Sequence, residues 1–406
     1  MENKIRLGII GIGNMGSAHA KNVADGSCPD FELVAIADVS EERRSWAKEN
    51  LGEQVKTFSD ATEMLDSGLL DACIVAVPHY DHASYAIACM QRDIHVLVEK
   101  PAGVYTKQVV EMNAEADKHP ELKFGMMFNQ RTNHIYRKLH ELVQSGIYGQ
   151  IRRTNWIITN WYRPQAYYDS GAWRATWAGE GGGVLLNQCP HQLDLWQWIC
   201  GMPTRVHAFL HYGKWHNIEV EDDVTAYVEY ENGATGVFIT TTGDGKGSNR
   251  LEIQLDKAKI VAEDGRLEVD EFEMSEPEFS RTYTKPFGAI PTKRIEPETD
   301  GKNEQHIGVI NAWGGAILRG EPMVADGREG INGLTISNAM HMSSWLNKTI
   351  ELPLDSELYY EELMKRVATS QKKDNVKTVF ADTSNTYGST ATTANGEYKK
   401  RWNTNW

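Results

Sequence analysis

The stretch KIRLGIIGIGNMG, from Lys4 to Gly16, decides the fold of this chain. Its first part, residues 4–10, is a short β-branched and apolar run that is typical of a buried strand. The strand leads directly into the pattern G-x-G-x-x-G, formed by Gly11, Gly13 and Gly16. A glycine fingerprint between a strand and a helix is the context in which a dinucleotide binds.

Each glycine of this fingerprint has a physical role. Gly11 allows a tight turn, Gly13 lets the backbone approach a pyrophosphate, and Gly16 lets helix and strand pack closely. A helix predicted over residues 17–25 would present free N–H groups to the phosphates. The residues of this stretch that we predict to bind the cofactor are Gly11, Gly13, Asn14, Met15 and Gly16.

An acidic residue follows the second predicted strand, residues 31–37. It is Asp38, which follows Gly16 at the spacing that is typical of a dinucleotide-binding unit. A carboxylate there accepts hydrogen bonds from the ribose hydroxyls and repels a 2′-phosphate, so NAD is favoured over NADP. Arg43 and Arg44 could weaken this preference, but we interpret both as part of a solvated helix face.

Strands and helices alternate over residues 1–128, which we assign to an NAD(P)-binding domain. This alternation predicts an α/β domain with a doubly wound parallel sheet. The other predicted strands cover residues 55–58, 71–77, 94–98 and 122–127, and the other helices cover 41–51, 61–67, 79–91 and 104–118.

Ligands of such sheets bind at the carboxyl ends of the strands. The residues at these ends that we predict to line the cofactor are Pro78, His79, His82, Glu99, Lys100 and Asn129. For His79 and His82, ordinary polar residues at a helix start are the alternative. A lysine beside a nicotinamide can hold or move a hydroxyl proton, and partial burial and the positive ring would lower the pKa of Lys100.

A different pattern begins after a helix predicted over residues 133–145. Strands now follow one another with few helices between them, which predicts an α+β domain with a large, mostly antiparallel sheet. We assign residues 129–370 to this domain, with a helix over 327–346 packing back on the first domain, and residues 371–406 to a polar tail or arm. The predicted strands are 151–159, 206–212, 223–229, 234–242, 250–255, 259–261, 266–269 and 352–354, the other helix is 304–318, and the loop is 273–299.

The segment GEGGGVLLNQCPHQLDLWQWICG, residues 179–201, carries the candidate residues Asn187 and His191. A helix is predicted over residues 184–200, with a kink or a break just before His191 because Pro190 removes a backbone donor. On a helix, Asn187 and His191 would share one face. The alternative is a buried helix whose histidine is an ordinary core residue.

Residues 160–177, NWYRPQAYYDSGAWRATW, are dense in aromatic and arginine side chains and are predicted to form a substrate wall. Their side chains could bind hydroxyls or a carboxylate, and Trp161 or Trp173 could stack on a ring. Core or interface packing is the alternative for each. The candidate substrate ligands are Trp161, Arg163, Tyr168, Arg174 and Asn187.

Composition narrows the function classes. The chain has 406 residues, a net charge of −14 and a pI of about 5.4, which disfavours nucleic acid and anionic membrane as partners. No apolar run approaches a membrane span, and the first residues lack a signal-peptide layout. Five scattered cysteines without CxxC spacing favour reduced thiols in the cytoplasm and no metal site.

Several motifs together resemble the Gfo/Idh/MocA family, the glucose–fructose oxidoreductase and inositol dehydrogenase group. They are the fingerprint 11–16, Asp38, Pro78 with His82, Glu99-Lys100-Pro101, and the triple glycine followed by Asn187 and His191. The resemblance implies an N-terminal Rossmann domain, an open-faced C-terminal domain, bound NAD or NADP, and a homodimer or homotetramer, here through the uncovered face of the C-terminal sheet. It also implies oxidation or reduction of a ring hydroxyl of a sugar, a glycoside or a cyclitol.

The resemblance also implies roles for individual residues. The family's catalytic lysine falls on Lys100, and its Asp-x-x-x-His pair falls on Asn187 and His191. Asparagine cannot become an anion, so this departure leaves Lys100 and His191 as the proton-handling pair and Asn187 as a substrate ligand. The leading hypothesis is an NAD-dependent dehydrogenase. Two alternatives remain: a glycoside hydrolase that uses NAD in transient ring oxidation, and a sensor that binds NAD or a sugar without turnover.

Overall fold

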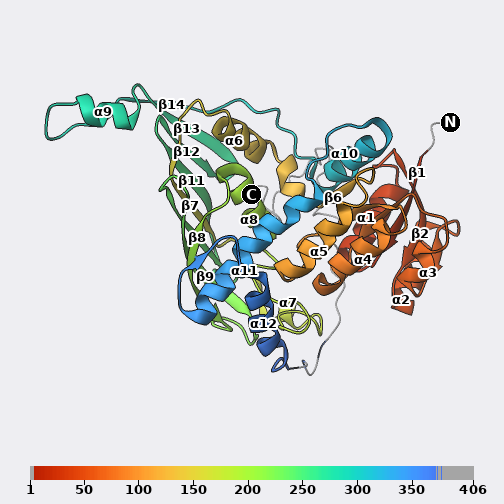
Figure 1. Cartoon of the computed structure of the whole chain (residues 1–406). Coiled ribbons are helices and arrows are strands. Elements are labelled where there is room, and N and C mark those ends of the chain that lie inside the picture. The colour runs from red at the N-terminus through yellow and green to blue at the C-terminus, as the bar shows by residue number, and fades with distance from the viewer. Residues whose placement is uncertain (1–3, 372, 374–375, 377–406) are drawn as a thin grey trace.

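Two β-sheets form the body of the molecule in the computed structural model, and most of the helices lie between and around them (Figure 1). The structure describes residues 4–371, 373 and 376. The predicted tail or arm, residues 371–406, therefore lies almost entirely outside the described residues. No helix in the described ranges is long and apolar enough to cross a membrane.

The first sheet is the predicted doubly wound parallel sheet. Within the described residues it has six strands in the order β3-β2-β1-β4-β5-β6, all parallel. Its strands read as continuous apolar runs because helices cover both faces. The strands are β1 Ile5–Ile10, β2 Phe31–Ala37, β3 Lys56–Phe58, β4 Ala72–Val75, β5 His95–Val98 and β6 Phe124–Met126; the helices are α1 Asn14–Ala24, α2 Glu41–Leu51, α3 Ala61–Leu65, η1 His79–Asp81, α4 His82–Met90 and α5 Thr106–Ala116.

The second sheet is mixed but mostly antiparallel, as predicted. Its order is β14-β13-β12-β11-β7-β10-β9-β8-β15 in the described part of the chain, and only the β7–β10 pair is parallel there. Its strands are β7 Ile151–Ile158, β8 Arg205–Tyr212, β9 Glu221–Glu229, β10 Thr235–Thr241, β11 Asn249–Leu255, β12 Ala258–Glu263, β13 Arg266–Phe272, β14 Thr292–Ile295 and β15 Ile350–Glu351.

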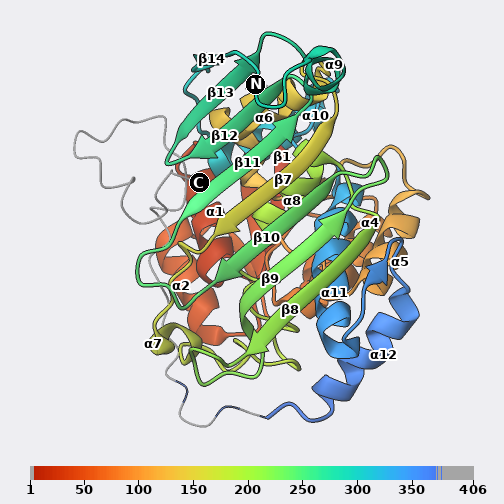
Figure 2. The same ribbon diagram turned by 90° about the vertical axis from the view of Figure 1, so that its left-hand side faces the viewer.

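Helices cover only the inner face of this sheet, so its outer face is open, as Figure 2 shows. The covering helices are α6 His134–Gln144, α8 Pro190–Cys200 and α11 Gly330–Leu346. Helix α11 also reaches the first domain, where the side chain of Asn338 accepts from the amide of Thr106 at 3.0 Å. The two domains therefore share a packed boundary.

The structure corrects several predicted boundaries. Residues 273–299 are not all loop, because they contain α9 Glu276–Thr282 and β14, which pairs with β13. The prolines of this stretch suggested a loop, although proline is tolerated in the first turn of a helix such as α9. The predicted strand 352–354 is displaced to β15, Ile350–Glu351. Two further helices, α7 Gln165–Tyr168 and α12 Ser356–Val367, were not predicted.

Helix α10, Gln305–Arg319, belongs to the second half of the chain but packs on the first sheet. The ring of Trp313 stacks on Phe31 with 5.3 Å between centroids, and its Nε1 donates to the carbonyl of Lys123 at 2.9 Å. Val309 and Ile310 are buried in the same apolar cluster as β1 and β2. The core of the first domain is therefore completed by a helix that lies far from it in the sequence, beyond most of the second domain.

Candidate active site

The fingerprint forms an open cradle at the amino end of α1. Gly11 has φ +81°, and a Cβ there would lie 2.6 Å from the carbonyl oxygen of Ala76. A Cβ at Gly16 would collide with the carbonyl of Gly11, whereas a Cβ at Gly13 would meet nothing within 4 Å. Helix α1 begins at Asn14 rather than at the predicted Ser17, because Gly13 already serves as its N-cap. The backbone here fits a pyrophosphate against the N-terminus of a helix.

Asp38 lies at the carboxyl end of β2 and is fixed by backbone donors. Its Oδ2 accepts from the amide of Ile12 at 2.9 Å, and its Oδ1 accepts from the amide of Ser40 at 2.8 Å. Interpreting Arg43 as part of a solvated face is wrong, since it is 7% exposed and its Nε donates to the carbonyl of Ile12. Arg44 donates to the carbonyl of Asp38 at 2.7 Å. Arg44 therefore fastens the residue that carries the carboxylate, and Arg43 fastens the turn of the glycine fingerprint.

Glu99 and Lys100 follow β5 and point to different neighbours. The carboxylate of Glu99 is buried and lies 2.6 Å from Nε2 of His19 on α1. Burial raises the pKa of Glu99, but the hydrogen bond with His19 and the positive charges around the carboxylate, that of Lys100 among them, together outweigh it and lower the pKa to about 2. Glu99 thus ties β5 to the first helix, and its carboxylate is charged.

The ammonium group of Lys100 reaches across to the second domain. Its Nζ donates to the backbone carbonyl of Asn187 at 3.0 Å. Burial lowers the pKa of Lys100 and outweighs the opposing effect of the negative charges of Glu99 and Glu180. A lysine whose pKa is lowered, placed at the end of a parallel strand, is suited to act as a general base or acid.

His79 and His82 lie just after β4, beyond Pro78. Burial lowers the pKa of both rings. The two nitrogens of His82 lie 2.6 Å from the carbonyl of Pro101 and 2.8 Å from that of Val77, so His82 fastens the turn that follows Lys100. His79 contacts the second domain, with Nδ1 3.3 Å from the carbonyl of Glu180.

The helix predicted over residues 184–200 begins only at Pro190, so the predicted break just before His191 is confirmed, whereas the helix predicted over residues 184–189 is wrong. Proline occupies the first turn of α8, where its missing N–H costs nothing. The preceding loop is fixed by the buried carboxylate of Glu221, which accepts from the amides of Gly183 and Leu185 at 2.9 and 3.0 Å and lies 3.0 Å from Nε2 of His341. A Cβ at Gly183 would collide with the carbonyl of Glu221, so this position has room only for glycine.

Asn187 and His191 consequently do not share a helix face. The side-chain amide of Asn187 donates to the carboxylate of Glu180. His191 lies in the first turn of α8, and its buried Nδ1 has no hydrogen-bond partner among the described residues. Burial lowers the pKa of His191 well below its usual value, and the charge of Lys100 acts in the same direction. His191 is therefore a neutral base beside Lys100.

Glu180 is a buried acid that the sequence analysis did not single out. It is 2% exposed, it accepts from the amide of Ala175 at 2.5 Å, and it holds the side chain of Asn187. Burial raises its pKa, and the charge of Arg174 opposes that shift. Its position directly before the triple glycine was the available signal.

The residues of the predicted substrate wall differ in their burial and in their contacts. The hydroxyl of Tyr168 donates to Thr242 at 2.7 Å, so it is occupied within the protein. Trp161 is 4% exposed. Tyr167, which was not singled out, lies between Arg163 and Arg174, with 5.2 and 4.6 Å from its ring centroid to the two guanidinium carbons.

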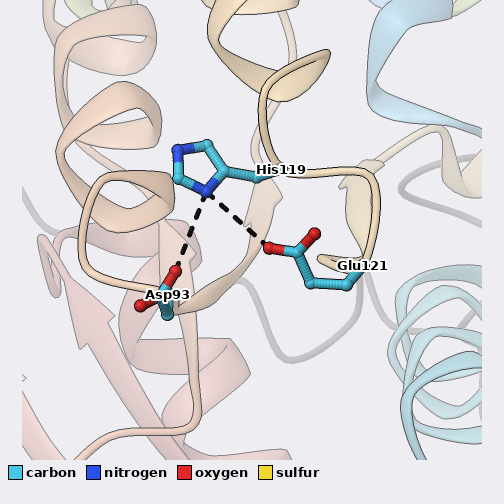
Figure 3. A group of neighbouring side chains, drawn as sticks. All are labelled: Asp93, His119 and Glu121. Carbon is cyan, nitrogen blue, oxygen red and sulfur yellow. Dashed lines mark ion pairs between the residues drawn. The ribbon is translucent and has the colours of Figure 1, made fainter.

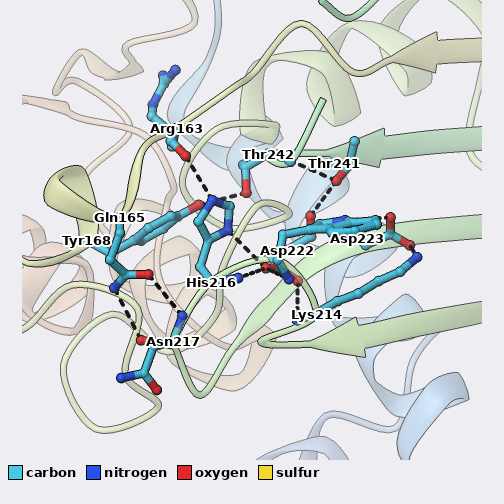
Figure 4. Close-up of polar contacts among 12 residues, drawn as sticks. Arg163, Gln165, Tyr168, Lys214, His216, Asn217, Asp222, Asp223, Thr241 and Thr242 are labelled. Atoms are coloured by element: carbon cyan, nitrogen blue, oxygen red, sulfur yellow. Dashed lines mark hydrogen bonds and ion pairs between the residues drawn. The ribbon is translucent and has the colours of Figure 1, made fainter. Parts of the chain in front are cut away.

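A polar network holds this wall against the ends of the sheet, as Figure 4 shows. Asp222 is fully buried and accepts from the amides of residues 214–216, and its Oδ2 lies 3.0 Å from Nδ1 of His216. Nε2 of His216 lies 2.8 Å from the carbonyl of Arg163. The Arg163 guanidinium points away from this network (Figure 4), so its backbone is anchored while its charge is left for other contacts.

Asn129 lies in η2, Asn129–Thr132, after β6. Its amide donates to the side chain of Gln305 at the start of α10. No sequence pattern connects these two residues, which are 176 positions apart.

One group of side chains has the spacing of metal ligands among the described residues, and it lies elsewhere. Nδ1 of His119 is 3.7 Å from Asp93 and 3.8 Å from Glu121, and both carboxylates are largely exposed (Figure 3). The group lies at the amino end of β5, opposite to Lys100. We therefore assign it no part in the chemistry.

This geometry defines a class of protein: a two-domain oxidoreductase with a dinucleotide-binding first domain. A family model described as "Oxidoreductase family, NAD-binding Rossmann fold" matches residues 5–126, and a "GFO/IDH/MocA C-terminal domain" model matches residues 136–261. The chain belongs to the Gfo/Idh/MocA family of NAD-binding oxidoreductases. The resemblance stated from the motifs is confirmed, as are the fold class and NAD as the cofactor.

The chain is similar to known dehydrogenases over most of their length. The chain is 27% identical to myo-inositol 2-dehydrogenase of Thermotoga maritima over 270 residues, which cover 64% of this chain and 76% of that protein. It is 26% identical to inositol 2-dehydrogenase of Rubrobacter xylanophilus over 351 residues, covering 83% and 90%. The crystal structure of the WlbA dehydrogenase from Bordetella pertussis in complex with NADH and UDP-GlcNAcA is similar, with a TM-score of 0.71, 25% identity, and 87% and 100% of the two chains covered.

Proposed function

We propose that this protein oxidises a ring hydroxyl of a sugar, a glycoside or a cyclitol, with NAD as hydride acceptor. The observation that carries the proposal is Lys100 at the carboxyl end of β5, in contact with the loop before His191. Relatives named as inositol dehydrogenases support a polyhydroxylated ring as the substrate.

The residues divide the work of the reaction. The fingerprint and Asp38 bind the dinucleotide, which when bound supplies a hydride acceptor at the nicotinamide. Lys100 or His191 would take the proton of the carbinol O–H group as its carbon gives up a hydride to bound NAD and the C=O bond forms. His191 is uncharged at neutral pH because its pKa is lowered, so it can accept a hydrogen bond or a proton from the hydroxyl.

Other residues position Lys100. The loop carbonyl of Asn187 holds the Lys100 ammonium, and Glu180 holds the side chain of Asn187, so hydrogen bonds connect the three residues. Positioning of this kind supplies much of the rate acceleration in hydride transfer. We also propose the cytoplasm as the location, since the five cysteines are free, buried thiols.

The test is incubation of the purified protein with NAD and a panel of cyclitols, aldoses and aryl glycosides, followed by NADH absorbance and aglycone release. Steady NADH formation with one class supports the dehydrogenase and identifies its substrate class. Aglycone release without net NADH would instead indicate the NAD-dependent glycoside hydrolase, and NAD binding without either signal would indicate the sensor.

Asp38 is expected to set the preference for NAD. Asp38→Asn should raise the ratio of kcat/KM for NADP over NAD by about tenfold, because it removes a negative charge worth ~1 kcal/mol next to the site of a 2′-phosphate. Arg43 and Arg44 would then lie beside the added phosphate. Steady-state kinetics with both cofactors measures the ratio. Glu49→Gln, an exposed change on α2, the helix that carries Arg43 and Arg44, should leave this ratio unchanged. An unchanged ratio in Asp38→Asn would contradict the role of Asp38 in cofactor preference.

We propose that a second copy covers the open face of the C-terminal sheet. Three large side chains on that face are exposed: Ile157 by 39%, Phe209 by 59% and Tyr227 by 42%. Phe209 and Tyr227 lie on the paired strands β8 and β9. Ile157 lies on β7, beyond β10, and the partly exposed Val237 and Ile239 of β10 are the register partners of Tyr227 and Ile157, which connects the patch. Light scattering at micromolar concentration should give a dimer or tetramer, and Phe209→Asp should lower the mass toward that of one chain. A monomeric parent protein would contradict the assignment.

A further inference from the structure

Two arginines of the substrate wall form no ion pair with an acid among the described residues. Nη1 of Arg163 donates to the carbonyl of Tyr162 at 2.9 Å, and Nη1 of Arg174 donates to the hydroxyl of Tyr167 at 2.9 Å. In the described part of the chain, neither guanidinium has a carboxylate oxygen within 4.0 Å. A half-buried guanidinium normally finds an anion, as Arg328 does with Asp117 at 2.8 Å.

Both guanidinium groups are held in place. The ring of Tyr167 lies between them, and its hydroxyl also accepts from Nε2 of Gln188 at 3.3 Å. Arg174 lies over Trp173 as well, with 4.7 Å to that ring centroid. Stacking on aromatic rings orients a guanidinium without neutralising it. The pair is therefore preorganised for an anion.

The arginines lie beside the reacting centre. Gln188, which contacts Tyr167, follows the residue whose carbonyl holds Lys100. Trp173, which contacts Arg174, also meets the ring of His79 edge-on at 5.7 Å. In addition, the positive charges of both arginines help to lower the pKa of Lys100, after the larger effect of burial.

Glu180, the buried acid beside the two arginines, is already hydrogen-bonded within the protein. Glu180 accepts from the amide of Ala175 and from the side chain of Asn187, and burial raises its pKa. A further cation, Lys373, comes from the last described part of the chain, and its Nζ donates to the carbonyl of Tyr168 at 2.8 Å. The negative charges of Asp169, Glu180 and Glu219 act on Lys373, and the contacts of Asp169 and Glu219 are with Gln165 and Gln371 rather than with either arginine.

We propose that the substrate carries an anionic group, a carboxylate or a phosphate, which Arg163 and Arg174 bind while the reacting carbinol lies at Lys100. The inference rests on the proposed oxidation of a ring hydroxyl and names the substrate more closely. A guanidinium recognises either anion through paired N–H donors, and losing one such charge-assisted contact lowers affinity by about ten- to a hundredfold.

The experiment compares three forms of the same rings: the neutral sugar or cyclitol, its uronate and its phosphate. Each is assayed with NAD for kcat/KM and, separately, for binding to the NADH-loaded protein by quenching of tryptophan fluorescence. The variants are Arg163→Gln and Arg174→Gln. Arg266→Gln serves as the matched control, because Arg266 is exposed in the β12–β13 hairpin.

We expect one anionic form to be preferred over the neutral one in both assays, and each site variant to lower that preference by about ten- to a hundredfold. Whether the uronate or the phosphate is preferred identifies the anion. A neutral ring preferred by the parent protein, or a preference that both variants retain, would overturn the inference. Arginine-dependent anion binding without any NADH formation would keep the inference and reject the proposed oxidation.

Discussion

Lys100→Met is expected to lower kcat by about two to four orders of magnitude, the range that general acid–base catalysis supplies. Methionine keeps the length and apolar contacts of the lysine stem but cannot exchange a proton. NAD binding should change little, because the described contact of Nζ is with the carbonyl of Asn187 in the second domain and not with the fingerprint. NADH formation measures turnover, and titration of the variant with NAD measures affinity.

The control is Lys118→Met, which removes an exposed ammonium that pairs with Glu115 on the surface. It should leave both quantities unchanged. If Lys100→Met retained a tenth of the turnover or more, the lysine would not carry the proton. If NAD affinity collapsed together with turnover, Lys100 would have a structural role.

The pH profile gives a second readout of the same lysine. Oxidation needs Lys100 as a free amine, so kcat/KM should rise with pH through a single ionisation. Because burial lowers its pKa, that ionisation should lie below the ordinary lysine value of 10.5. Lys100→Met should lose it. The pKa of His191 is lowered well below 6.5, so no inflection from this ring is expected near neutral pH.

Arg131→Met is expected to give the largest loss of stability, about 3–5 kcal/mol. The side chain of Arg131 is 2% exposed, and its Nε and Nη2 reach the two oxygens of Asp194 at 2.8 and 2.7 Å. Its Nη1 reaches Glu329, in η3 Gly327–Glu329, at 2.7 Å. Methionine would leave the carboxylate of Asp194 buried without its cation. Thermal unfolding should show a fall in Tm on the order of ten degrees.

Arg137→Met is the matched control, because Arg137 pairs with Asp300 at the surface, where the two side chains are 40% and 43% exposed. Its cost should stay below ~1 kcal/mol. Burial already raises the pKa of Asp194 against the opposing effect of Arg131. In Arg131→Met this opposition is lost and the pKa rises further, so the loss of stability should shrink as the pH falls and the acid takes up a proton. Equal losses for the two variants would contradict the buried ion pair.

The sequence predicted best what neighbouring residues determine. Strand 31–37 and helix 41–51 match β2 and α2 because an apolar run and a serine N-cap, Ser40, define them locally. The ends of parallel strands also placed Asp38 and Lys100 correctly at one edge of the sheet. These signals depend on period and spacing, which a single sequence contains.

Contacts between residues that are distant in the chain could not be predicted from the sequence. The helix predicted over 184–200 is wrong only over residues 184–189, because Glu221, which lies on a later strand, fixes this segment as a loop. Arg43 was interpreted as solvated because the sequence does not reveal its contact with the carbonyl of Ile12, 31 positions away. The position of Tyr167 between two arginines also requires tertiary structure, since no periodicity distinguishes it from Tyr168.

The packing of α10 on the first sheet has a consequence for the order of events on the ribosome. The strands of the first sheet leave the exit tunnel early, but the indole that stacks on Phe31 is made only after the entire second sheet except β15. Until Trp313 emerges, part of the apolar face of β1 and β2 lacks its cover. The nucleotide-binding half is therefore finished late in synthesis, although it is begun first, and a chaperone that shields nascent chains has a defined surface to protect.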